Sequence, residues 1–242
     1  MANTTITDQT QSYRPEDPKT RQSALTLYVI LAGLFIASLV TCNLVANKFV
    51  TLNLGFTEFI LSAGVLAYPL TFLITDLLSE LYGRKLTNKI IASGFGALLL
   101  VLIILKLGGA FHAIDSSPVS DAAYATVFAN SWRVIFASMV AYLLAQLIDV
   151  RLFHFWKRLT KGKHLWLRNN ASTILSQLVD TTLVVGVLFI GVEPINKILL
   201  FILHGWLFKM LCALADTPLL YLTVWAGRKK FNLAQNQELS LS

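Results

Sequence analysis

Charged residues are scarce in this sequence, and cysteines are almost absent. Only 14% of its 242 residues are Asp, Glu, Lys or Arg, whereas a soluble domain carries roughly a quarter. The two cysteines, Cys42 and Cys212, both fall in apolar stretches, which argues against a disulfide framework or a metal site and favours buried, inert thiols.

Several catalytic signatures are also missing. The chain contains no G-x-x-x-x-G-K-[ST] loop for ATP phosphates and neither the H-E-x-x-H nor the G-x-S-x-G motif. These absences exclude ATP hydrolysis by a P-loop and the usual metalloprotease and hydrolase mechanisms. We therefore expect neither an enzyme nor a bound cofactor or metal.

Long apolar runs are what the sequence has instead. Hydrophobic residues make up 55% of the chain, and the mean hydropathy is +0.64. Six runs can be recognised, at about Leu25–Ala46, Phe59–Leu78, Ile90–Leu105, Val134–Leu152, Ala171–Val192 and Ile195–Ala226. Segments this apolar satisfy their backbone hydrogen bonds in lipid by forming helices. The sequence predicts an all-α membrane protein with six transmembrane helices.

The flanking charges predict the domain limits and the orientation. Residues 1–22 are predicted to be a disordered cytoplasmic tail, 23–228 the transmembrane domain and 229–242 a second cytoplasmic tail. Of the 20 Lys and Arg residues, fifteen fall on the side of the two termini, four on the opposite side, and Lys209 inside a span. Because cytoplasmic loops are rich in Lys and Arg, both termini are predicted to be cytoplasmic. This distribution also explains the net charge of +7 without a nucleic-acid partner.

Six spans with both ends on one side divide into two halves of three, which enter the membrane from opposite faces. Such halves are compatible with a 3+3 inverted repeat. The internal sequence similarity between the two halves is weak. It consists of Ile74-Thr75-Asp76 in the second span and Val179-Asp180-Thr181 in the fifth.

Three ionisable residues are predicted to lie deep in the membrane, where each costs at least about 2.5–3.5 kcal/mol. Asp180 is central in the fifth span, and Lys209 and Asp216 lie seven residues apart in the sixth. They favour a substrate or proton site between these spans. The alternative is a structural ion pair that locks the two helices together.

Polar residues at helical spacing accompany these charges. The stripes consist of Thr173, Gln177 and Asp180 in the fifth span, Tyr142, Gln146 and Asp149 in the fourth, and Asn43 and Asn47 in the first. One stripe alone is compatible with helix–helix packing. Several stripes together predict a lined cavity, and Pro69 and Pro218 interrupt two of the spans beside it.

An acidic pair marks the cytoplasmic mouth. Asp76 and Glu80 are one helical turn apart and precede Gly83, Arg84 and Lys85. Ion pairs between these acids and the basic loop could close a gate, with Asp149 at the same end. A simple cap that anchors the loop is the alternative.

Four of these segments resemble one known family. TDLLSELYGRK at 75–85, AYLLAQLIDVRLF at 141–153, NNASTILSQLVDTT at 169–182 and KMLCALADTPLLY at 209–221, together with Asn43, are similar to the queuosine precursor transporters, also called vitamin uptake transporters. The resemblance covers roughly residues 25–228. It implies six transmembrane helices and an inner-membrane protein that takes up 7-deazaguanine bases, such as 7-cyano-7-deazaguanine, for tRNA modification.

That substrate is compatible with the polar residues. A carboxylate can accept the adjacent N–H donors of a guanine edge, and aromatic faces suit its flat ring. The expected contacts are Asp180, Asp216, Asp76, Lys209, Gln177, Asn43 and Gln146 for the polar edge and Phe72, Tyr142 and Tyr221 for the ring.

Other functions stay open from the sequence. The chain could be the binding subunit of an energy-coupling-factor importer, which needs partner ATPases, or an intramembrane enzyme, for which no signature is present. The expected partners are a small molecule and the lipid bilayer. The oligomeric state is open, and a homodimer is among the alternatives.

Overall fold

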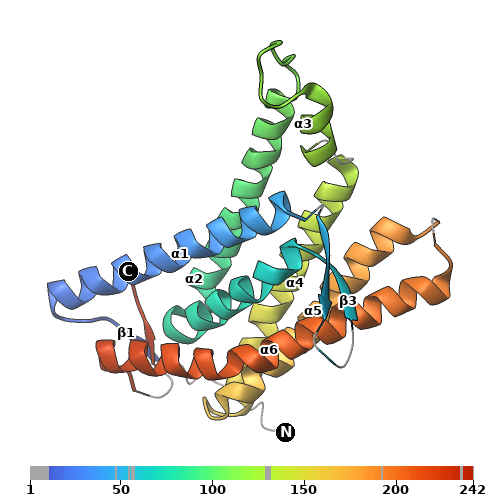
Figure 1. Cartoon of the computed structure of the whole chain (residues 1–242). Coiled ribbons are helices and arrows are strands. Elements are labelled where there is room, and N and C mark those ends of the chain that lie inside the picture. The colour runs from blue at the N-terminus through green and yellow to red at the C-terminus, as the bar shows by residue number, and fades with distance from the viewer. Residues whose placement is uncertain are drawn as a thin grey trace, which may run out of the picture.

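The computed structural model describes residues 11–46, 48–53, 55, 58–128, 132–191, 193–234 and 237–241, and helices dominate it (Figure 1). The elements are β1 (Gln11–Tyr13), α1 (Pro18–Leu44), β2 (Phe49–Asn53), β3 (Glu58–Ser62), α2 (Gly64–Gly108), α3 (Asp121–Phe128), α4 (Trp132–Leu159), α5 (Leu165–Phe189), α6 (Ile195–Phe231) and β4 (Gln237–Leu239). The helical class predicted from the sequence is confirmed.

Four of the described helices are long and apolar enough to cross a membrane. They are α1, α2, the Met139–Leu159 part of α4, and α6. Helix α5 has 25 residues and is also long enough, but it carries Arg168, Asn169, Asn170, Gln177 and Asp180, all of them buried. These polar residues face the protein interior.

Helix α2 consists of two helices joined at a sharp bend. Its 45 residues would reach about 68 Å if straight, more than twice the thickness of a hydrocarbon core. At Gly83 the backbone has φ 74° and ψ 171°, a conformation that glycine adopts without steric cost. Figure 1 shows the two halves running in different directions. The halves contain the apolar runs predicted as the second and third spans.

The start of the second predicted span is wrong. Residues Phe59–Ser62 belong to strand β3, which pairs antiparallel with β2, and the helix begins only at Gly64. The hairpin buries Phe59 and Leu61 against Phe208 of α6. Because a short apolar run fits a strand as well as a helix, the hydropathy pattern alone could not separate the two.

The boundaries of the two predicted tails also change. Within the segment predicted to be disordered, residues 11–13 form β1, which pairs in parallel with β4, and α1 already begins at Pro18. The carboxylate of Asp17 caps α1 by accepting hydrogen bonds from Oγ1 and the backbone N–H of Thr20, which lower the pKa of Asp17. At the other end α6 continues to Phe231. Residues 1–10 of the predicted tail lie outside the described residues.

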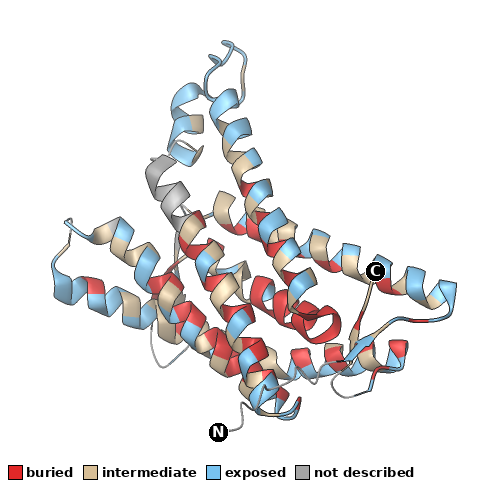
Figure 2. Ribbon diagram, turned by 180° about the vertical axis from the view of Figure 1, so that it is seen from behind, coloured by how far each residue is buried: buried red, intermediate tan, exposed pale blue. Residues whose placement is uncertain are grey.

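The interior contains charged and polar side chains beside apolar ones, and many large apolar side chains face outward. The buried stretches are red in Figure 2. Asp76, Glu80 and Asp149 are each at most 2% exposed. Large apolar side chains such as Ile103 and Leu222 are instead 64% and 59% exposed. Since apolar side chains lose nothing by facing lipid tails, this arrangement fits a hydrocarbon surrounding.

Candidate functional site

A small cavity lies between α2, α5 and α6. It is lined by Tyr68, Pro69, Phe72, Leu73 and Asp76 from α2, Asn169, Thr173 and Gln177 from α5, and Lys209, Ala213 and Asp216 from α6. Its volume is about 20 Å³, which is room for about one water molecule. Five predicted contact residues are therefore brought together: Phe72, Asp76, Gln177, Lys209 and Asp216.

An ion pair joins α5 to α6 beside the cavity. Nζ of Lys209 lies 2.6 Å from Oδ2 of Asp180, and the same ammonium group lies 4.4 Å from the centre of the Tyr68 ring. Asp180 is 3% exposed and Lys209 11% exposed at their side chains. The predicted pairing of these two residues is thus present in the structure. The second oxygen of Asp180, Oδ1, is buried without a hydrogen-bond partner.

Aromatic rings form one wall of the cavity. The ring centres of Tyr68 and Tyr142 are 5.2 Å apart, and those of Phe72 and Tyr142 are 6.2 Å apart, both in edge-on contact. Behind them, Gln146 donates from Nε2 to the hydroxyl of Tyr142 at 2.8 Å and accepts from the hydroxyl of Thr75 at 3.2 Å. Gln146 therefore orients the wall and has its amide satisfied within the protein.

Helix α5 instead presents polar groups that the protein does not satisfy. Gln177 is 2% exposed, and neither its Nε2 nor its Oε1 has a hydrogen-bond partner. Thr173, one turn earlier, is 5% exposed and its hydroxyl is likewise without a partner. Buried polar atoms in this state cost about 1–3 kcal/mol each. Both residues line the cavity, so a polar ligand there would satisfy them.

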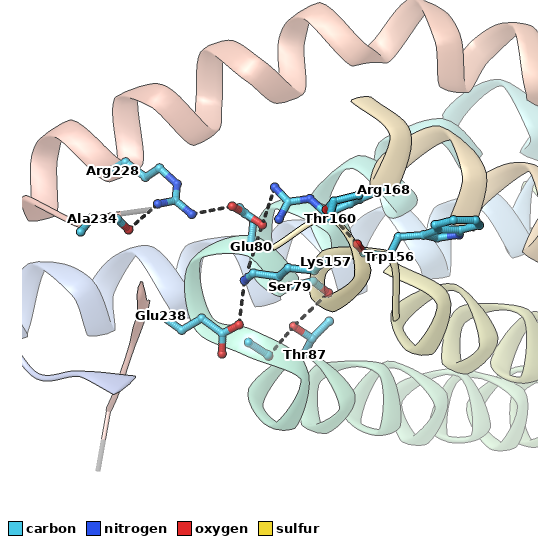
Figure 3. Close-up of polar contacts among 11 residues, drawn as sticks. Ser79, Glu80, Thr87, Trp156, Lys157, Thr160, Arg168, Arg228, Ala234 and Glu238 are labelled. Carbon is cyan, nitrogen blue, oxygen red and sulfur yellow. Dashed lines mark hydrogen bonds and ion pairs between the residues drawn. The ribbon is translucent and has the colours of Figure 1, made fainter. Parts of the chain in front are cut away.

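A network of ion pairs surrounds Glu80 (Figure 3). Oε2 of Glu80 lies 3.2 Å from Nη2 of Arg168 and 3.6 Å from Nζ of Lys157, and its Oε1 accepts from Nη2 of Arg228 at 2.5 Å. Lys157 also lies 2.7 Å from Oε1 of Glu238. One carboxylate thereby ties α4, α5 and α6 to the end of the first half of α2.

The gate predicted from the sequence is corrected in its partners. Glu80 pairs with Arg168, Lys157 and Arg228, whereas Arg84, the predicted partner, lines a separate surface cleft with Lys85 and Lys89. The left-handed backbone at Gly83 separates Arg84 from the helical register of Glu80. Asp149, the third residue predicted for the gate, lies beside Asp76.

Five predicted contacts do not line the cavity: Asn43, Tyr142, Gln146, Asp180 and Tyr221. Asn43 and Tyr221 are turned away from it. Nδ2 of Asn43 donates to the backbone oxygen of Leu39 at 2.9 Å, within α1. Tyr221 is 42% exposed, and its hydroxyl accepts from the backbone N–H of Trp166 at 3.1 Å. Helical spacing gave the position of these residues along the chain but not the face that α1 and α6 turn towards their neighbours.

The sequence reasoning missed Tyr68, Asn169 and the central role of Arg168. Arg168 had been counted among the basic loop residues, yet its guanidinium is 2% exposed. Its position directly before Asn169 and Asn170 in α5 was a usable signal, because a polar run that opens an apolar helix has to face the interior. In the described part of the chain no group of three His, Cys, Asp or Glu residues could hold a metal ion.

These features define a helical membrane protein with a small cavity between its helices, lined by aromatic and buried polar side chains, which is the construction of a small-molecule transporter. The profile of the family described as "Putative vitamin uptake transporter" matches residues 62–223. The chain belongs to this family, as the resemblance of its motifs implied.

Three curated relatives are similar to the chain. The "Probable queuosine precursor transporter" of Bacillus subtilis (strain 168) is 32% identical over 159 residues, which is 65% of this chain and 69% of the relative. The "Queuosine precursor transporter" of Escherichia coli (strain K12) is 31% identical over 56% of this chain and 58% of the relative. The "Probable queuosine precursor transporter" of Haemophilus influenzae (strain ATCC 51907 / DSM 11121 / KW20 / Rd) is 30% identical over 52% of this chain and 51% of the relative. No solved structure matches the chain.

Proposed function

We propose that this protein imports queuosine precursors, 7-deazaguanine bases such as 7-cyano-7-deazaguanine, across the cytoplasmic membrane for tRNA modification. The names of the three relatives support the substrate class. Support from the molecule itself comes from the unsatisfied polar atoms of the cavity beside its aromatic wall.

The observation that carries the proposal is that Gln177 and Asp180 lie three residues apart, on the same face of α5. The amide of Gln177 and Oδ1 of Asp180 are buried without partners. A deazaguanine offers neighbouring N–H donors and a carbonyl acceptor, which a carboxylate and an amide can bind together. The rings of Phe72 and Tyr68 line the same cavity and provide flat apolar surface for the base.

Import requires this cavity to open. Its volume of about 20 Å³ compares with roughly 300–1,000 Å³ for ligand sites. The structure therefore corresponds to a closed state in this scheme. Two sets of contacts would have to separate in turn: the Lys209–Asp180 pair between α5 and α6, and the Glu80 network.

The proposed membrane topology has six crossings. Treating the two halves of α2 as separate crossings and adding α5 to α1, α4 and α6 gives six segments with both termini on the cytoplasmic side. Support comes from the basic residues, which concentrate near the Gly83 bend, the α4–α5 turn and the end of α6. A 3+3 inverted repeat and a homodimer are compatible with this topology and stay predictions.

Uptake of labelled 7-cyano-7-deazaguanine tests the function. Cells unable to synthesise the base should accumulate label only when they express this chain. Gln177→Leu keeps size and burial but removes the amide, so uptake should fall at least tenfold while the protein stays folded. Thr182→Val, on an exposed position of the same helix, should transport normally. Equal uptake with and without the chain would refute the proposed substrate.

The same uptake assay distinguishes a transporter that works alone from the binding subunit of an energy-coupling-factor importer. A binding subunit of that kind depends on partner ATPases, so its uptake would be sensitive to vanadate and an ATPase would co-purify. Uptake by the purified chain alone in lipid vesicles would exclude this alternative.

A further inference from the structure

Two buried carboxyl groups lie close together, one of them on the wall of the cavity. Asp76 of α2 and Asp149 of α4 are 1% and 0% exposed, and they are near enough to influence one another. Two ionised carboxylates in one buried site repel each other, which favours a proton on one of them. Oδ1 of Asp76 and Oδ2 of Asp149 are buried without a hydrogen-bond partner. A single shared proton would satisfy both oxygens.

The cations nearby are engaged with other acids. Arg168 of α5 is paired with Glu80, and Lys209 of α6 is paired with Asp180. The charged groups that face the carboxyl pair or line its cavity are Glu80 on α2, Arg168 and Asp180 on α5, and Lys209 and Asp216 on α6. Among the described residues no cation forms an ion pair with Asp76 or Asp149, so a proton on one of them would remove the repulsion between the two carboxyl groups.

The surroundings place this proton on Asp76. Oδ1 of Asp149 accepts a hydrogen bond from the hydroxyl of Ser176 at 2.9 Å. Hydroxyl donors stabilise an ionised carboxylate. Asp76 faces Glu80 one turn along its own helix, which disfavours a second negative charge there. Asp76 therefore donates and Asp149 accepts.

We propose that Asp76 and Asp149 form a proton-binding site that couples import through this cavity to the movement of one proton. The inference rests on the proposed transport function. A proton from the outer solution binds to the Asp76 carboxylate as the cavity closes. Opening to the cytoplasm lets water solvate both carboxylates, and the proton leaves Asp76 to that water. Asp76 lines the cavity, so a bound base and the proton would occupy adjacent positions.

Infrared spectroscopy of the purified, substrate-free protein tests the shared proton directly. At neutral pH the wild type should show the C=O stretching band of a buried protonated carboxyl group. Asp76→Asn should lose the band while keeping its thermal stability, because an amide N–H can still donate to Asp149. Asp149→Asn should shift the band, and Asp216→Asn, which removes a half-buried acid of the same cavity, should leave it in place. Absence of the band in the wild type would overturn the inference, as would a band unaffected by both Asp76→Asn and Asp149→Asn.

Transport in vesicles tests the coupling. An inward proton gradient should drive wild-type accumulation of labelled 7-cyano-7-deazaguanine, and a protonophore should abolish it. Asp149→Asn should keep exchange of label between the two sides but lose gradient-driven accumulation. Accumulation that survives the protonophore, or that persists in Asp149→Asn, would overturn the coupling. If the wild type exchanges no label at all, the proposed substrate is wrong, and the infrared result still decides the proton site independently.

Discussion

The ammonium group of Lys209 lies 2.6 Å from Oδ2 of Asp180, in a part of the protein where both side chains are almost fully buried. The pair joins α5 to α6 beside the cavity. Breaking a buried pair by removing one partner costs about 3–5 kcal/mol, because the other charge is left uncompensated. The pair is therefore both a structural lock and a part of the candidate site.

A double-mutant cycle should separate these two roles. We expect Lys209→Met to lower the free energy of unfolding by several kcal/mol and Asp180→Asn/Lys209→Met to recover most of that stability without recovering uptake. Thermal unfolding in detergent and binding of the base measure the two effects. Lys197→Met is the matched control, because Lys197 pairs with Glu193 at 3.1 Å on the exposed part of α6, where a pair is worth about 0–1 kcal/mol. Full recovery of both stability and uptake in the double variant would show that the pair is structural only.

Glu80→Gln should destabilise the protein strongly. The substitution removes the anion that Arg168, Lys157 and Arg228 share, and two of these cations are buried. We expect a loss of about 3–5 kcal/mol, as for other buried pairs that lose one partner. Arg84→Gln removes the cation that the sequence had assigned to Glu80 and should change stability by less than about 1 kcal/mol. If both variants lost the same amount of stability, Arg84 would be a partner of Glu80, as predicted from the sequence.

Much of the fold could be predicted because lipid imposes a simple rule on the sequence. A run of about 20 apolar residues has to become a helix in a bilayer, so α1, α4 and α6 follow from hydropathy. The β2–β3 hairpin does not, because it is short and buries Phe59 against α6 through a contact that exists only after folding.

The candidate site was predictable in part for a related reason. Asp180 and Lys209 stand out because charge is rare at membrane depth, and their contact follows from adjacent spans. The partners of Glu80 could not be predicted in this way: Arg228 lies 148 positions further along the chain. Such a pairing depends on how α2 and α6 pack, and many basic residues near the helix ends compete for it. The proximity of Asp76 to Asp149 was hidden because hydropathy gives no information on which helix faces which.

Gly83→Ala should damage the joint between the two halves of α2. Gly83 has φ 74°, where a residue with a Cβ costs roughly 1–2 kcal/mol, and a Cβ there would also collide with the carboxylate of Glu238. Gly96→Ala is the matched control, since Gly96 lies in the second half of α2 with no atom within 4 Å of an added Cβ. We expect Gly96→Ala to be neutral or slightly stabilising and Gly83→Ala to lower the melting temperature. A melting temperature unchanged by Gly83→Ala would mean that the bend tolerates a regular residue.

Reporter insertions should reveal the proposed six-crossing topology. We expect insertions after residues 50, 115 and 194 to report the outside and those after residues 87 and 162 the cytoplasm. The physical reason is the charge around these sites: Arg84, Lys85 and Lys89 follow the Gly83 bend, and Lys161 and Lys163 occupy the α4–α5 turn. The decisive site is residue 162. If α5 does not cross the membrane, the insertions after residues 162 and 194 should report the same side. Opposite signals at these two sites would show that α5 crosses the membrane despite its many buried polar residues.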